Sequence, residues 1–278
     1  MGRGALLLLP LAAGLVLAAG QGRAERIDEA PIPDRAVTLD LLPLEVPFEA
    51  LSPSALGRVQ AVLGASIFAH RVEGIRYRSR EEIFSFLLDH PDFAAAVARA
   101  CRVGEYRLTR TEEGYWGDDA RGAVGEIRLL HAEPGRRLFH LSGRYDRRLL
   151  PTIEGQILIL FEFAHHASPV GDTVAESRLT GHLRLDTPVV GAIAGIVATL
   201  TRPLVERAVE RKVRRFFRTV ARVSGWAYDD PEGLAALLDG HPEVPQDGTL
   251  EAFRRLLLAH RLPPWAEGLR LLPPPSPE

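Results

Sequence analysis

The segment LVERAVERKVRRFFRTVARVS, residues 204–224, governs how the rest of this chain must fold. Its apolar residues recur every three or four positions, which is the spacing of one face of an α-helix. At about 100° per residue they fall within a single arc. The members of this arc are Val205, Val209, Val213, Phe216, Phe217, Val220 and Val223. A helix with so wide an apolar face must cover another apolar surface, which the preceding residues have to supply.

The opposite arc of the same helix is strongly basic and is relieved only in part by Glu210, four residues before Arg214. Its members are Arg207, Arg211, Arg214, Arg215, Arg218 and Arg222. A charged face is most often simply solvated. The alternative is peripheral contact with an anionic membrane surface, because about 1 kcal/mol per basic residue accumulates over several arginines. Nucleic acid is not an expected partner, since the formal net charge is only −2 and export is predicted.

Residues 66–187 show the period of β-strands separated by turns. The predicted strands are Ser66–Arg78, Val103–Thr111, Ala123–His131, Arg136–Asp146, Ile153–His166 and Thr173–Thr187. Short turns at Glu133–Gly135 and Ser168–Gly171 make the strands that they join antiparallel neighbours. Apolar and polar residues alternate in most strands, so we expect a sheet that is covered on one face only. Ile153–His166 is apolar on both faces, which favours a central strand or one beneath an extra layer.

Short helices flank these strands. Ser79 and Glu82 form a capping-box pattern that predicts a helix ending at Asp89, and Pro91 suits the first turn of the next helix. A helix is also predicted over Ser54–Leu63 with Ser54 as its cap, and others over residues 231–238 and 249–260. Tyr115–Asp118 is either one more strand or a loop.

The order of these elements resembles the helix-grip fold of the START-like, or polyketide-cyclase-like, lipid-binding superfamily. The resemblance is carried by SREEIFSFLLD, residues 79–89, which is similar to the superfamily's first helix, and by the helix Val205–Val223. It covers Ser66–Tyr228 and implies an α+β fold, a curved antiparallel sheet wrapped around a long C-terminal helix. It also implies a cavity for a lipid-like or other apolar ligand. The chain departs from the superfamily in having six predicted strands where seven are usual.

We expect such a cavity to lie between the sheet and the long helix. The sheet would line it with Phe139, Leu141, Tyr145, Ile157, Ile159, Phe161, Leu179 and Leu183. The helix would close it with Val209, Val213, Phe216 and Val220. The sequence therefore predicts a carrier of an apolar small molecule.

An enzyme that uses the same cavity, such as a cyclase or hydrolase, is the first alternative. His140, Arg144, Glu162 and His182 lie on predicted strands and would have to converge there as an acid–base group. No nucleophile elbow, phosphate loop or dinucleotide fingerprint occurs, so no catalytic residue, metal ligand or cofactor is predicted. A second alternative is a membrane-associated assembly protein that uses the basic helix face.

The first residues have the pattern of a bacterial-type signal peptide. Arg3 precedes an apolar run from Ala5 to Ala19 that is shorter than the roughly 20 residues of a membrane-spanning helix. Cleavage is expected after Ala24, with Gly20 as the second choice, which predicts a periplasmic or secreted protein. The predicted parts are a signal peptide (1–24), a Pro-rich extension with a short helix (25–65), the helix-grip domain (66–228) and a C-terminal helical extension with a disordered tail (229–278).

The stretch Val189–Leu200 is apolar and interrupted by glycines. It either packs beneath the start of the long helix or forms a mobile flap at the cavity mouth or membrane. Cys101 is the only cysteine, so no disulfide can form within the chain.

Overall fold

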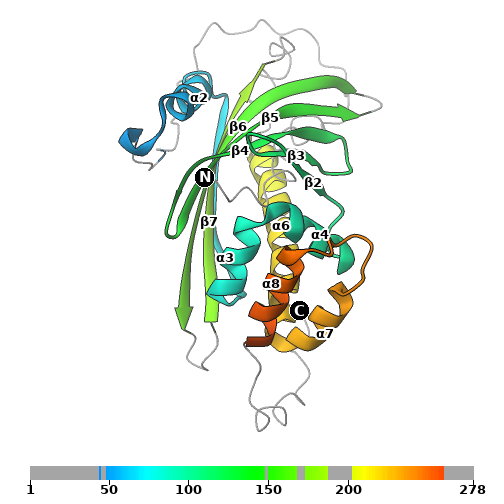
Figure 1. Ribbon diagram of the computed structural model, residues 1–278. Coiled ribbons are helices and arrows are strands. Elements are labelled where there is room, and N and C mark those ends of the chain that lie inside the picture. The colour runs from blue at the N-terminus through cyan, green and yellow to red at the C-terminus, as the bar shows by residue number, and fades with distance from the viewer. Residues whose placement is uncertain (1–43, 45–47, 148–149, 168–172, 187–201, 260–278) are drawn as a thin grey trace, which may run out of the picture.

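Seven strands form one antiparallel sheet that curves around a long helix, α6 (Figure 1). The computed structural model describes residues 44, 48–147, 150–167, 173–186 and 202–259. The strand order is β1-β7-β6-β5-β4-β3-β2. The bounds are β1 Phe68–Arg78, β2 Arg107–Arg110, β3 Tyr115–Asp118, β4 Ala123–Glu133, β5 Arg136–Arg147, β6 Leu150–Ala167 and β7 Thr173–Leu185. The α+β helix-grip fold is thus confirmed, and Tyr115–Asp118 is the seventh strand.

Helix α6, Arg202–Asp229, extends beyond the predicted helix at both ends. Its apolar arc lies against the concave face of the sheet, where Val209, Val213, Phe216 and Phe217 are at most 4% exposed. Tyr77 of β1 and Phe161 of β6 meet Phe217 with ring centroids 6.0 Å apart. The helix and the sheet therefore share one hydrophobic core, as the amphipathic pattern predicted.

The convex face of the sheet is also covered, which corrects the expectation of a sheet with one covered face. Helix α2, Pro53–Leu63, follows the short 3-10 turn η1, Phe48–Ala50, and lies over β6 and β7. Its Val59 and Val62 are fully buried in a second cluster with Leu158 and Leu160 of β6. The extra layer explains why β6 is apolar on both faces.

Four helices gather around the C-terminal part of α6 (Figure 1). They are α3 Glu81–Asp89, α4 Pro91–Ala100, α7 Pro231–Leu238 and α8 Gly248–Ala259. Phe253 of α8 is fully buried against Phe86 and Phe93, with ring centroids 5.5 and 5.2 Å apart. The C-terminal extension therefore packs onto the helix-grip core through α3 and α4.

Two predicted helix caps are wrong. The N-cap of α3 is Arg80, and the Ser79 hydroxyl finds no hydrogen-bond partner in the part of the chain that the structure describes. The N-cap of α2 is Ser52, whose hydroxyl accepts a hydrogen bond from the Ala55 amide at 3.2 Å. The observed caps lie two residues before the predicted serine in α2 and one residue after it in α3.

The predicted signal peptide, the stretch 189–200 and the predicted tail from residue 260 onward lie outside the described residues. Of the helices within the described ranges, none has the length and apolar character that crossing a membrane requires.

Candidate ligand-binding site

Four glycines face one another across four adjacent strands. Gly117 of β3 pairs with Gly125 of β4, which pairs with Gly143 of β5, which pairs with Gly155 of β6. Each lies two residues from a buried residue of the concave face, so all four belong to that face. We call this set the glycine row. It removes the side chains from one band of the surface that faces α6.

The backbones come so close at the glycine row that other residues do not fit. A Cβ on Gly125 would collide with the carbonyl oxygen of Ser142, and one on Gly143 with that of Val124. A Cβ on Gly155 would lie 2.7 Å from the carbonyl oxygen of Arg184. Glycine inside a strand marks this kind of close approach, and here it lets the sheet bend around α6.

Rows of apolar side chains border the glycine row on both sides. Leu141, Ile157 and Leu183 are register partners on one side. On the other side Ala123, Tyr145 and Ile153 are register partners. These six side chains are between 2% and 6% exposed.

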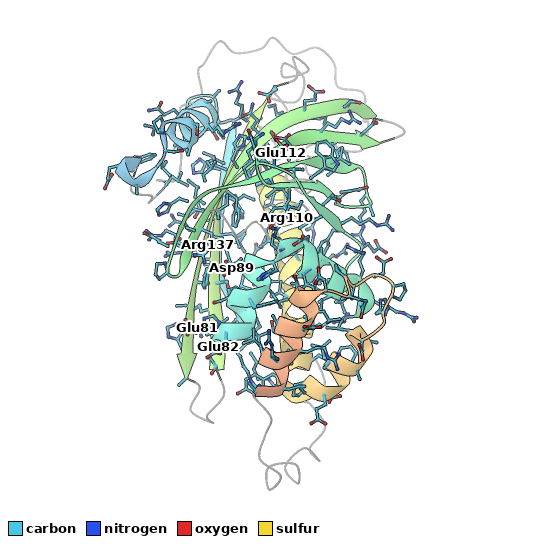
Figure 2. The ribbon with its side chains drawn as sticks, in the orientation of Figure 1. Glu81, Glu82, Asp89, Arg110, Glu112 and Arg137 are labelled. Atoms are coloured by element: carbon cyan, nitrogen blue, oxygen red, sulfur yellow. The ribbon has the colours of Figure 1, made fainter. Side chains whose placement is uncertain are left out.

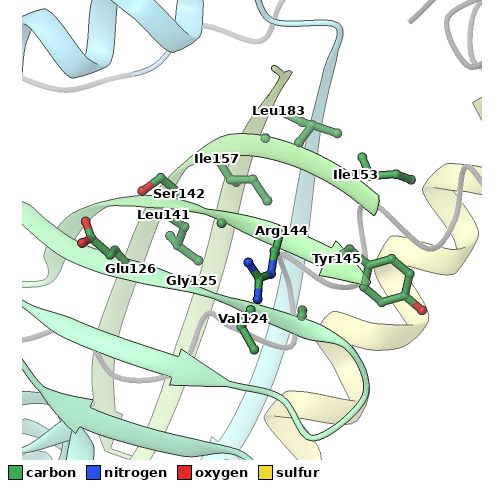
Figure 3. A pocket seen from close by; sticks show the side chains of 13 residues that line it. Val124, Gly125, Glu126, Leu141, Ser142, Arg144, Tyr145, Ile153, Ile157 and Leu183 are labelled. Atoms are coloured by element: carbon green, nitrogen blue, oxygen red, sulfur yellow. The ribbon is translucent and has the colours of Figure 1, made fainter. Parts of the chain in front are cut away.

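The two rows and the glycine row enclose an apolar hollow, shown in Figure 3. The room that it leaves for a water-sized sphere, which we call its closed part, is about 40 Å³, and the empty space is about 430 Å³ when open solvent is included. The lining that the structure describes comes from β4, β5, β6 and β7. We call this space the glycine hollow.

The glycine hollow occupies only part of the predicted cavity. Four of the predicted lining residues line it, namely Leu141, Tyr145, Ile157 and Leu183. The others are buried in the core between sheet and helices. They are Phe139, Ile159, Phe161, Leu179, Val209, Val213, Phe216 and Val220.

Aromatic side chains explain why the rest of the interface is filled. Phe216 meets Phe217 with ring centroids 5.3 Å apart, and Phe161 contacts Phe84 and Phe163 at 6.2 and 5.2 Å. Val220 also borders a second space, between α3, α4 and α6, whose closed part is about 30 Å³. The expected cavity between the sheet and the helix therefore does not extend over all of the predicted lining residues, because these rings occupy part of the space.

The glycines were missed when the lining was predicted from apolar residues alone. Gly125, Gly143 and Gly155 lie inside predicted strands, and a glycine in a strand interior signals a bend or close approach. That signal was available in the sequence. Their alignment into one row depends on strand register, which only the structure provides.

The four residues of the enzyme alternative alternate with concave-face residues and so belong to the convex face, and of the four only Arg144 lines the glycine hollow (Figure 3). His140 of β5 and His182 of β7 are both register partners of Leu158, which packs against α2. Arg144 and Glu162 alternate with concave-face residues in the same way as these histidines. The predicted convergence of the four side chains inside the cavity is therefore wrong.

Two of these groups are histidines whose pKa values are lowered by burial, and Glu162 is held in ion pairs. Burial lowers the pKa of His140, whose Nε2 lies 3.2 Å from Gln156 Oε1, and burial also lowers the pKa of His182. The Glu162 carboxylate pairs with Arg178 at 3.0 Å and with Arg136 at 3.3 Å. Figure 2 shows how densely polar side chains cover the outside of the molecule. Because only Arg144 of the four residues lines the hollow, they do not form an acid–base group there.

Many solved structures are similar to this chain, and two of them are described here. The crystal structure of Ara h 8.0201 has a TM-score of 0.33 and 12% identity, over 57% of this chain and 97% of that one. An uncharacterized protein from Rhizobium leguminosarum has a TM-score of 0.26 and 13% identity, over 53% and 97%. At TM-scores this low we base nothing on either likeness, and the fold follows from the strand order and α6. No family model and no curated protein matches the chain.

Proposed function

We propose that this protein is a carrier that binds a lipid-like or other apolar small molecule in the glycine hollow. The observation that carries the proposal is the glycine row, which leaves a band of the concave face without side chains. We further propose membership of the START-like superfamily, on the strength of the fold and its helix order.

An empty apolar hollow is costly for a folded protein. At about 24 cal/mol per Å³ of cavity, the closed part of about 40 Å³ corresponds to roughly 1 kcal/mol of lost stability. A larger aliphatic residue would ordinarily remove that cost, but a Cβ does not fit at Gly125 or Gly143. A bound apolar group would restore the lost contacts. It can fill the space because it is not attached to the closely spaced backbones of the strands.

The shape of the hollow favours a ligand with a slender apolar end. The closed part is smaller than the roughly 150 Å³ cavity that accepts a benzene ring. The end of an acyl chain would therefore enter between Leu141 and Tyr145, and the rest of the molecule would occupy the open mouth.

A filling variant tests this assignment. In Ala123→Phe the new ring occupies the hollow, so we expect the affinity for a fluorescent fatty acid, dansylundecanoate, to fall about tenfold or more. Ala164→Phe is the matched control, because Ala164 is exposed on the convex face of β6. Both variants are checked for folding by thermal unfolding.

A variant that enlarges the hollow provides a second test in case Ala123→Phe does not fold. Ile153→Ala lengthens the closed part, so competition with saturated fatty acids of increasing length should favour longer chains than the wild type does. Absence of dansylundecanoate binding to the wild-type chain, or equal binding by Ala123→Phe and Ala164→Phe, would overturn the proposal. An unchanged chain-length preference in Ile153→Ala would place the ligand elsewhere.

We propose that the carrier works outside the cytoplasm, from the signal-peptide pattern of residues 1–24. Expression of the full chain in a bacterial host should give a periplasmic product that begins at Glu25. A product that retains residues 1–24 and stays in the cytoplasmic fraction would refute this part alone.

A further inference from the structure

One face of α6 carries a stripe of exposed arginines. All six side chains that the sequence placed on the basic arc are exposed in the structure. We call them the arginine stripe: Arg207, Arg211, Arg214, Arg215, Arg218 and Arg222. The buried arc of the same helix forms the core against the sheet, so the stripe points away from it.

Most of the stripe has no counter-charge. Arg214 is paired with Glu210 at 2.8 Å, one turn earlier on the same helix. The other five arginines make no ion pair with any residue that the structure describes. Elsewhere on the surface, arginines such as Arg78, Arg99 and Arg178 do pair with carboxylates. The stripe therefore has an unusual density of unpaired positive charge.

The dimensions of the stripe suit a flat anionic surface. From Arg207 to Arg222 the helix rises roughly 22 Å at 1.5 Å per residue, so a small anion could meet only one or two arginines. The chain as a whole has a formal net charge of −2, so the residues outside the six arginines of the stripe carry a formal net charge of −8. A long polyanion that wraps around the protein would be repelled there, whereas a plane touches the stripe alone.

We infer that the arginine stripe docks this protein on an anionic bilayer, where it collects or delivers the apolar ligand. The purpose of docking rests on the proposed function, but the docking surface itself does not. The stripe lies on the side of α6 that points away from the sheet, and the glycine hollow lies in the concave face of the sheet, which faces that helix. A docked carrier thus has α6 between the membrane surface and the sheet.

Flotation with vesicles tests the docking. The fraction of protein that floats is compared between vesicles of phosphatidylcholine alone and vesicles that also contain phosphatidylglycerol. We expect the wild-type chain to float only with the anionic vesicles and to be released as salt shortens the screening length. In Arg211→Gln/Arg215→Gln/Arg218→Gln the partition coefficient should fall by about fivefold for each charge removed.

A control variant with the same net charge tests whether the position of the removed arginines, and not their number, determines flotation. Arg76→Gln/Arg107→Gln/Arg255→Gln removes the same charge from exposed positions on β1, β2 and α8. It should float almost as the wild type does. Equal losses in the two triple variants, equal flotation with neutral vesicles, or stronger retention on duplex DNA than on vesicles would overturn the inference.

Ligand uptake distinguishes failure of the docking from failure of the carrier function. The stripe variant should keep the wild-type affinity for dansylundecanoate in solution but take it up more slowly from anionic vesicles. Absence of binding in solution would refute the carrier function alone. Uptake at the wild-type rate by the stripe variant would refute the docking alone.

Discussion

Gly125 and Gly143 are register partners on β4 and β5, and a Cβ on either one would lie within 2.8 Å of the other's Cα. The two strands thus lie closer together at this point than they could if either residue carried a side chain. The glycine hollow exists because of this close approach. The glycines leave a band without side chains, and rows of apolar side chains border that band on both sides. The same contact makes the glycines vulnerable to substitution, which the first prediction tests.

Gly143→Ala should destabilise the fold by about 1–3 kcal/mol, because the added methyl group collides with the backbone of β4. Gly181→Ala on β7 is the matched control. Its Cβ would lie 4.0 Å from the nearest atoms, which is an ordinary contact. Urea unfolding followed by circular dichroism measures both, and equal effects of the two changes would contradict the close approach at the glycine row.

Phe161→Ala should destabilise the protein by about 3–5 kcal/mol, because this ring fills the space between β6 and α6. Trp116→Ala is the control, since the Trp116 side chain is 46% exposed. That change should stay within about 0.5 kcal/mol. A small effect of Phe161→Ala in thermal unfolding would mean that the aromatic part of the core is loosely packed.

The two buried histidines beneath α2 should make the fold sensitive to acid. Burial, reinforced by Arg71, lowers the pKa of His182, and burial lowers that of His140 against the hydrogen bond with Gln156. In the unfolded chain both take up protons below about pH 6.5. The unfolded state then binds more protons than the folded state, so stability is full above that pH and falls as the pH drops further.

His182→Leu should reduce this loss, since it removes a proton-binding group that only the unfolded chain can use. The measurement is the free energy of unfolding in urea at about pH 7.5 and about pH 5. His166→Leu, at an exposed position of β6, is the control. An identical difference between the two pH values in wild type and His182→Leu would count against the linkage.

Ser52→Ala should cost about 1 kcal/mol of stability, because it removes the hydroxyl that accepts the Ala55 amide at the start of α2. Ser54→Ala should cost less, since the Ser54 hydroxyl contacts only that of Ser52, at 3.2 Å, in the described part of the chain. Thermal unfolding compares the two variants. A larger effect at Ser54 would restore the cap that the sequence pattern favoured.

Much of the fold could be predicted because its signals are local. The apolar arc of α6 and the alternation in β5 and β7 follow from side-chain periods of 3.6 and 2, which hold wherever the segment packs. The pattern of β6, apolar on both faces, indicated a central strand or one beneath an extra layer, and β6 is both. The cap of α2 was wrong because Ser52 also fits the cap position, and the cap of α3 was wrong because that helix begins one residue later than the Ser79 pattern predicts.

The site could be predicted only in part. Leu141, Tyr145, Ile157 and Leu183 line the glycine hollow as expected, since burial on the concave face follows from alternation. The filling of the remaining space by Phe161 and Phe216 depends on how the rings interlock, and no pattern along the chain reports that.

The sequence by itself determined which faces of the strands and of α6 are apolar, and where the arginines lie on that helix. Only the tertiary structure decided that Gly117, Gly125, Gly143 and Gly155 form one row and that His140 and His182 lie beneath α2. The physical reason is register, which is set by pairing between distant strands and by irregularities such as that between Leu129 and His131. A shift of one residue would turn every side chain of a strand to the other face and disperse the glycine row.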